Sequence, residues 1–316
     1  MKSKPQKILL SIVLILLSYG FIIYKIISFK ELRNIDFSAH YSSSDFLIFL
    51  LVIILMFLNW SLEAIKWKIL IDKIQHFNFL KALQAIFSGI TIGIFTPNRV
   101  GEIGGRVIFM EKGKRTFGVL ATGIGSFAQF ITTIIAGIFG FGMFLIFYPH
   151  RISINPLFNK VTVCGLIVVL IILFLIYFNI KKIKSLLLKI RFFNSKADQL
   201  EHLSETKISD LLKTLLLSFA RYFVFTSQFF LLLLFFNIHL TIREAFIAIS
   251  LVYLFATLIP TTTLIELGIR GSLAIFFVGI FSNNILGIVL STSFLWFINI
   301  SIPSIIGSLF FIKNKL

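Results

Sequence analysis

Two short motifs of identical spacing place charged residues inside hydrophobic sequence. Each reads Glu-x-Gly-x-Arg and follows a proline. The residues are Pro97, Glu102, Gly104 and Arg106 in the first motif, and Pro260, Glu266, Gly268 and Arg270 in the second. Glutamate and arginine are four residues apart in both, so a helix brings them to one face, within reach of an ion pair. A charge at membrane depth costs at least about 3 kcal/mol, which indicates that the repeated pair has a function.

The chemistry that these residues favour is the binding of an anion. The fork of an arginine suits a phosphate, a proline frees backbone groups, and glycines let the backbone approach a ligand. A helix that starts after each proline also points its positive end toward the membrane interior. The candidate substrate-binding residues are Arg99, Glu102, Arg106, Arg221, Glu266 and Arg270, with Pro97, Gly101, Gly104, Pro260 and Gly268 at the tips. The alternative is that each Glu–Arg pair only pins its own segment together.

Arg221 lies in the middle of an apolar segment that has no acidic residue near it. Its partner must therefore come from another segment. The acids within apolar sequence are Glu63, Glu102 and Glu266, against four arginines, so one positive charge is left for an anionic ligand. Glu63 and Lys66 are flanked by tryptophans, and we expect them to anchor their helix at the membrane interface. Asn59, Gln129, Gln228 and the threonine runs 132–133 and 261–263 either line a polar path or make interhelical hydrogen bonds.

The composition is that of a polytopic membrane protein. Of the 316 residues 58% are hydrophobic and 14% charged, and the mean hydropathy is +0.99. The net charge of +17 does not indicate nucleic acid, because 20 of the 30 lysines and arginines fall on one side of the membrane if the amino terminus is cytoplasmic. This is the positive-inside asymmetry, and it predicts that both termini are cytoplasmic. Anionic lipid headgroups are the partners that the basic excess favours.

Hydrophobic segments predict about six full spans. These are 8–29, an uncleaved first helix, and 45–71, 116–147, 161–180, 208–238 and 285–312. Between them, 80–110 and 241–281 are apolar, interrupted by proline, and apolar again. The charge distribution requires each to begin and end on one side, so we expect two re-entrant helical hairpins whose irregular tips are buried in protein or line a wet cavity.

The order of segments predicts an internal duplication. Corresponding segments of 8–147 and 161–312 are offset by about 160 residues, and each half reads helix, helix, hairpin, helix. The halves start on opposite sides of the membrane, so the fold class we predict is all-α, with two inverted repeats in one membrane domain, 1–316. Residues 181–207 alternate lysines with leucines and phenylalanines. They predict an amphipathic cytoplasmic linker, which serves either as a connection or as a lipid sensor.

Enzymatic motifs are missing from the sequence. It has no intramembrane aspartate, no His-x-x-x-His, no His-Glu-x-x-His and no Gly-x-Ser-x-Gly. We therefore expect no catalytic residue, no metal and no cofactor. The single cysteine, Cys164, is interpreted as a lipid-facing or packing residue.

The chain resembles a flippase-like family named for the transmembrane region of phosphatidylglycerol lysyltransferases. The resemblance rests on the run from Thr96 to Glu102 followed by Arg106, on Lys66-Trp67, and on the element from Pro260 to Arg270, where three threonines replace flexible residues. It implies a bacterial inner-membrane protein that moves an anionic phospholipid or a polyprenyl-phosphate-linked intermediate between leaflets. The sequence shows no aminoacyl-transfer domain. Two other classes stay open: a membrane-embedded glycosyl or phosphoryl transferase, and a scaffold for envelope-biosynthesis enzymes.

Overall fold

The computed structural model describes residues 43–96, 99–149, 156–179, 206–259 and 263–313, which form helices and contain no strand. In chain order the elements are α2 Ser43–Ile71, α3 Phe79–Gly93, α4 Gly101–Val107, the 3₁₀ turn η2 Lys112–Lys114, α5 Arg115–Phe147, α6 Pro156–Phe178, α10 Ile208–Phe235, α11 Ile242–Leu258, α12 Thr263–Val278, α13 Ile285–Trp296, the π-helical turn η3 Phe297–Ser301 and α14 Ile302–Lys313. The predicted all-helical class is therefore confirmed for this part of the chain.

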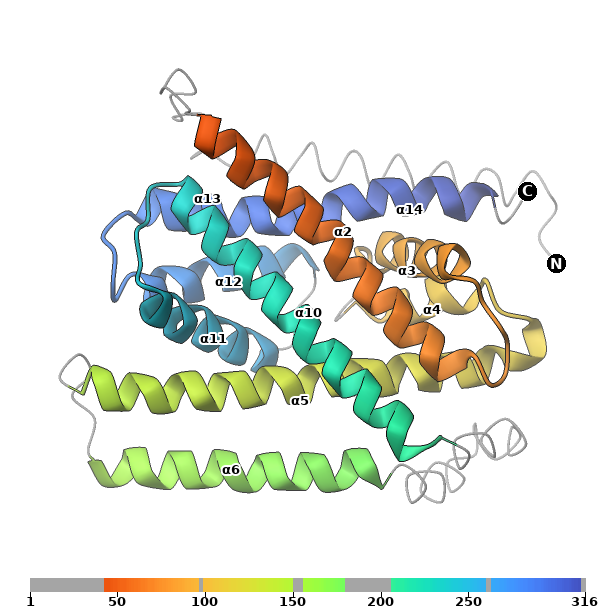
Figure 1. Ribbon diagram of the computed structural model, residues 1–316, viewed down its shortest axis with the longest axis horizontal. Helices are drawn as coiled ribbons and strands as arrows, with labels where there is room; N and C mark the ends of the chain where they lie inside the picture. Colours follow the sequence, from red (N-terminus) through yellow and green to blue (C-terminus); the bar gives the residue numbers. More distant parts are fainter. Residues whose placement is uncertain (1–42, 97–98, 150–155, 180–205, 260–262, 314–316) are drawn as a thin grey trace.

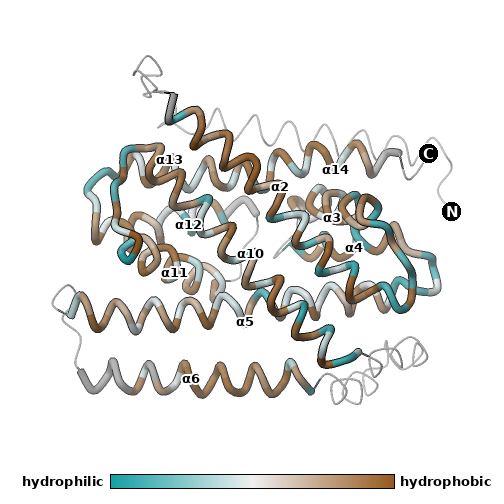
Figure 2. The backbone as a smooth tube through the Cα atoms, viewed as in Figure 1, coloured by the Kyte–Doolittle hydropathy of each residue, from teal (hydrophilic) through white to brown (hydrophobic). Residues whose placement is uncertain are grey.

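Four helical segments are long and apolar enough to cross a membrane. They are Asp45–Ile71, Lys112–Phe147, Ile208–Phe235 and Ile285–Phe310, which match four of the six predicted spans. The span predicted at 161–180 falls on α6, whose apolar stretch, Cys164–Phe178, is shorter. Span 8–29 and linker residues 181–205 lie outside the described residues. Figure 2 shows hydrophobic residues along most of α5 and α6 and hydrophilic residues in the loops at both ends of the bundle.

The two proline-interrupted segments each form a pair of packed helices. α3 packs on α4, and α11 packs on α12. Side-chain caps fix where two of these helices begin: Asn78 accepts a hydrogen bond from the Lys81 backbone N–H, and Thr241 with Glu244 forms a capping box. In Figure 1, α3 and α4 lie at one end of the bundle and α11 and α12 at the other.

α2 and α10 run side by side in opposite directions and cross the middle of the view in Figure 1. α5 and the α13–α14 segment flank the two helix pairs. α3 packs on α14, where a Cβ added to Gly307 would overlap the Phe87 carbonyl oxygen. α11 packs on α5, where a Cβ added to Gly140 would overlap Ser250 Oγ. Glycine is required at both crossings because the two backbones approach so closely.

The last predicted helix, 285–312, is interrupted at mid-length. Residues Phe297–Ser301 form a π-helical turn, in which the Ile302 N–H donates to the Phe297 carbonyl five residues back. Pro303 explains the turn, because a proline within a helix lacks an N–H and its ring crowds the carbonyl four residues earlier, that of Asn299. Asn299 lies within this turn, beside the ion pairs described next.

Candidate anion-binding site

Glu63, on α2, is the centre of a buried ionic cluster. Its Oε1 accepts a hydrogen bond from Arg106 Nη1 at 2.8 Å, and its Oε2 lies 2.8 Å from Arg221 Nη1 and 2.6 Å from Lys66 Nζ. The Glu63 side chain is 3% exposed. One carboxylate therefore holds three cations that come from α2, α4 and α10.

The interpretation of Glu63 and Lys66 as an interface anchor was wrong. Lys66 is 1% exposed, its Nζ donates to Ser218 Oγ at 3.5 Å, and its stem lies against Gly125 of α5. A lysine so enclosed cannot reach the headgroup region, and the salt bridge to Glu63 offsets part of its desolvation. Both residues belong to the interior of the bundle.

The first motif is built into this cluster. Glu102 bridges two arginines: its Oε2 accepts a bond from Arg106 Nη2 at 3.3 Å, and its Oε1 lies 2.5 Å from Arg99 Nη2. The Arg106 side chain is 4% exposed. Close packing of α4 on α3 makes this burial possible, because a Cβ on Gly105 would lie 2.5 Å from the Cα of Gly89.

Arg99 stands at the break between α3 and α4 with a left-handed backbone, φ 56°. This conformation is uncommon for a residue other than glycine and carries a local cost of about 1–2 kcal/mol. Thr96 holds the turn beside it, because the Gly101 N–H donates to Thr96 Oγ1 at 2.7 Å. The strained turn directs the Arg99 side chain to Glu102 and to a cavity.

Arg221 is oriented by a polar chain that crosses the bundle. Its Nε donates to Asn59 Oδ1 at 2.9 Å, and its guanidinium lies 4.7 Å from the centre of the Trp60 ring. Asn59 Nδ2 donates to Asn299 Oδ1 at 3.2 Å, and Trp60 Nε1 donates to the Asn299 carbonyl at 3.2 Å. The predicted need for a partner from another segment is met by Glu63.

The second motif has fewer partners. Arg270 Nη2 lies 2.6 Å from Glu266 Oε1, which is the only ion pair of either residue within the described part of the chain. The Arg270 side chain is 29% exposed, and its Nε has no hydrogen-bond partner among the described residues. Arg270 therefore keeps donors that a ligand can use.

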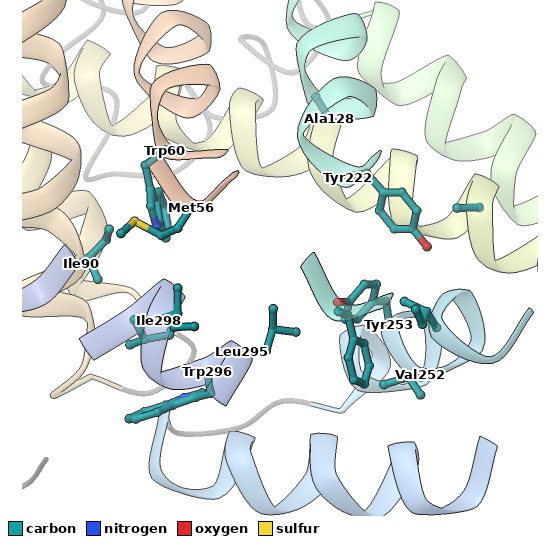
Figure 3. Close-up of a cluster of buried hydrophobic side chains, with 14 of the residues drawn as sticks. Met56, Trp60, Ile90, Ala128, Tyr222, Val252, Tyr253, Leu295, Trp296 and Ile298 are labelled. Carbon is teal, nitrogen blue, oxygen red and sulfur yellow. The ribbon is translucent and has the colours of Figure 1, made fainter. Parts of the chain in front are cut away.

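A cavity of about 200 Å³ lies where these elements meet. Three arginines line it, Arg99 from the first helix break, Arg221 from α10 and Arg270 from α12. The other lining residues are Asn59, Trp60, Gln129, Thr133, Tyr222, Phe225, Tyr253, Ala256, Thr257, Leu295, Trp296, Asn299 and Ile300. None of these residues is acidic. Figure 3 shows the aromatic residues Trp60, Tyr222, Tyr253 and Trp296, which come from four helices.

Several polar atoms at this cavity have no hydrogen-bond partner among the described residues. They include Arg99 Nε, Arg270 Nε and the Tyr253 hydroxyl, and the Tyr253 side chain is 94% buried, at 6% exposure. Buried donors normally find a partner. All three atoms belong to residues that line one cavity, which indicates a place for a ligand or ordered water that accepts hydrogen bonds.

The predicted site residues divide into two groups. Arg99, Arg221 and Arg270 line the cavity, whereas Arg106, Glu102 and Glu266 are not among its lining residues and make ion pairs beside it. Gly101 packs on the Ile92 carbonyl, whereas no described heavy atom lies within 4 Å of a Cβ built on Gly104 or Gly268, so the space beside these two glycines is open. α4 has only seven residues, too few for a strong helix dipole. Pro97 and Pro260 lie outside the described residues.

Sequence reasoning missed Lys66, Asn299 and Tyr253 as site residues. The spacing of Glu63 and Lys66, three residues apart inside apolar sequence, was a usable indication of a buried pair. Of the polar residues considered, Asn59, Gln129 and Thr133 line the cavity, whereas Gln228 donates to the Val52 carbonyl. Within the described residues, no group of three or more His, Cys, Asp or Glu could hold a metal.

The sequence comparison agrees with this architecture. No curated protein and no solved structure matches the chain. A family model described as the lysylphosphatidylglycerol synthase TM region matches residues 7–302, and such a family implies a membrane protein of lipid synthesis or translocation. The chain is therefore an integral membrane protein that belongs to the family of lysylphosphatidylglycerol synthase transmembrane regions.

Proposed function

We propose that the protein moves a lipid with an anionic headgroup between the two leaflets of the membrane. The observation that carries the proposal is the cavity lined by Arg99, Arg221 and Arg270, with no acidic residue among those that line it. Passage of the headgroup is the costly step, because a charge in hydrocarbon costs several kcal/mol or more. An arginine-lined cavity lowers that cost while the acyl chains stay in lipid.

The proposal includes two inverted repeats with re-entrant hairpins. Its support is that the two helix pairs lie at opposite ends of the bundle and that their contacts correspond. Ser88 on α3 donates to the Gly307 carbonyl of α14. Ser250, 162 residues later on α11, lies against Gly140 of α5. Each hairpin thus packs on the closing helix of the other half, as in transporters whose repeats rock about a central site.

In this mechanism the headgroup enters from one leaflet and reaches Arg270, which is the most exposed of the three arginines. It then contacts Arg221 and Arg99 and leaves toward the other leaflet as the repeats rock. Arg106, Glu63 and Lys66 do not touch the headgroup but hold the elements that carry the three arginines. The orientation that we propose has both termini in the cytoplasm of a bacterium, at the inner membrane.

The test is leaflet exchange of a fluorescent anionic phospholipid in vesicles that contain the purified protein. Arg270→Gln and Arg99→Gln should each slow exchange about tenfold or more, because each removes charged hydrogen bonds to the headgroup. Arg243→Gln is the matched control: Arg243 is exposed, stacks on Phe147 and does not line the cavity. Undiminished exchange in both cavity variants refutes the proposal. A covalently altered lipid product would favour a transferase instead.

A further inference from the structure

We propose that the site selects a dianionic phosphate, the head of a phosphomonoester lipid, over a singly charged phosphodiester. The inference rests on the proposed function and names its substrate class. It follows from three features of the same site: the balance of buried charge, the number of donor groups and the elements that supply them, and the size of the cavity.

Charge balance is the first argument. The cations of the connected cluster and the cavity are Lys66, Arg99, Arg106, Arg221 and Arg270, and the acids paired with them are Glu63, Glu102 and Glu266. Five cations against three carboxylates leave two positive charges in excess among the described residues. A phosphodiester neutralises one of them and leaves the other uncompensated in a medium where charge is costly. A phosphomonoester carries about −1.5 to −2 at pH 7 and neutralises both.

The donor arrangement is the second argument. The three guanidinium groups come from three separate elements, the first helix break, α10 and α12. Arg99 Nε, Arg270 Nε and the Tyr253 hydroxyl are free among the described residues. A phosphomonoester presents three terminal oxygens in a tetrahedral array, whereas a phosphodiester presents two. Guanidinium groups supplied by three separate elements suit three oxygens better than two.

The size and lining of the cavity complete the argument. Its volume, about 200 Å³, exceeds the roughly 30 Å³ share of one water molecule in the liquid several-fold, so it admits a headgroup rather than one water. A lysylated headgroup would bring ammonium groups next to Arg99, Arg221 and Arg270. No lining residue is an acid that could pair with them. The site therefore disfavours a cationic headgroup.

The decisive comparison uses two lipids that differ by one methyl group. Fluorescent phosphatidic acid and its methyl ester have the same chains, but the ester carries a single charge at every pH above its acid range. At about pH 7.5 phosphatidic acid should exchange about tenfold faster, and the gap should close toward about pH 5, because the second phosphate pKa is about 6. Rates in protein-free vesicles are subtracted. Equal or faster exchange of the methyl ester, or of a lysylated phosphatidylglycerol, overturns the inference and leaves translocation standing.

A binding measurement separates the inference from the proposed function. The unfolding temperature of the protein in neutral detergent is compared with lysophosphatidic acid, with its methyl ester and with glycerol 3-phosphate. Greater stabilisation by lysophosphatidic acid than by the ester supports the inference even if no lipid is exchanged, which would refute translocation alone. Equal stabilisation by acid and ester overturns the inference. If glycerol 3-phosphate stabilises as well as the lipid, the dianion is supported and the lipid source is refuted.

Variants tie the preference to the proposed residues. Arg270→Gln removes one of the two excess charges, so it should reduce the preference for phosphatidic acid over its methyl ester toward unity. Arg243→Gln changes the net charge of the protein equally but lies away from the cavity, so it should keep the full preference. A preference that Arg270→Gln leaves unchanged, in a protein that unfolds at the normal temperature, overturns the assignment.

Discussion

The first Glu-x-Gly-x-Arg motif is packed into the interior, whereas the second faces the cavity. Arg106 is 4% exposed and binds two carboxylates, Glu63 and Glu102. Arg270 is 29% exposed and binds one, Glu266. The two motifs have the same residue types at the same spacing, so the difference comes from what packs against them. The same four-residue ion pair serves as a brace in one half and, we propose, as a receptor in the other.

The environments of the two arginines differ in the number of carboxylates within reach, two for Arg106 and one for Arg270. Under the proposed duplication, the two motifs are 164 residues apart and Ser88 and Ser250 are 162 apart, so the counterpart of Glu63 falls at 225–227 on α10, a stretch without an acidic residue. Phe225 lines the cavity and offers no charge. Arg270 therefore lacks the second carboxylate that holds Arg106. The same motif can therefore leave an arginine with fewer partners when the neighbouring helix offers no acid.

Replacing the central acid should have the largest effect. Glu63→Gln leaves Lys66, Arg106 and Arg221 without their common partner and should cost about 3–5 kcal/mol of stability, as for other broken buried pairs. Glu266→Gln removes the partner of an arginine that is 29% exposed and should cost less than about 1 kcal/mol. Thermal unfolding in detergent measures both.

The matched rescue for this prediction is Lys66→Met in the Glu63→Gln background. It removes one of the uncompensated cations, so it should restore part of the lost stability, as a coupled pair does in a double-mutant cycle. Equal destabilisation by Glu63→Gln and Glu266→Gln would contradict the prediction, because it would show that the two carboxylates contribute equally to stability.

The next effect separates the two motif arginines. Arg106→Gln should lower stability by about 1–3 kcal/mol, because it removes charged hydrogen bonds to Glu63 and Glu102 in a buried site. Arg270→Gln should change stability by less than about 1 kcal/mol but abolish most leaflet exchange. Unfolding temperature and exchange rate are measured on the same preparations. An unchanged unfolding temperature in Arg106→Gln, or an unfolded Arg270→Gln protein, would contradict the proposed difference between the two arginines.

Local patterns in the sequence predicted local structure well. Segment length and hydrophobicity located four spans, and the four-residue spacing predicted the pairs Glu102–Arg106 and Glu266–Arg270, both of which are confirmed. The acids available to Arg221 were also identified correctly, with Glu63 among them. These features depend on neighbours along one helix, or on the rule that a buried charge needs a partner.

The long-range features could not be predicted in the same way. Glu63 meets Arg106 and Arg221 across 43 and 158 residues of chain, and no local pattern encodes which faces of α2, α4 and α10 converge. Lys66 was assigned to the membrane surface because lysines near helix ends usually reach the headgroups. The π-helical turn at Phe297–Ser301 has a local cause, Pro303. The length and hydrophobicity of the segment, which predicted the span, carry no information about this turn.

The last prediction compares the glycines of the two motifs. In Gly105→Ala the new Cβ would lie 2.5 Å from Gly89 Cα, so α3 and α4 must separate, at a cost of about 1–3 kcal/mol. Gly268→Ala and Gly104→Ala place a methyl group where no described atom lies within 4 Å, and the better helix propensity of alanine should make them neutral or stabilising by up to about 1 kcal/mol. Unfolding temperatures test the difference. A stable Gly105→Ala protein would mean that the first motif is held by its ion pairs alone, whereas a destabilised one shows that close helix packing buries Arg106 against Glu63.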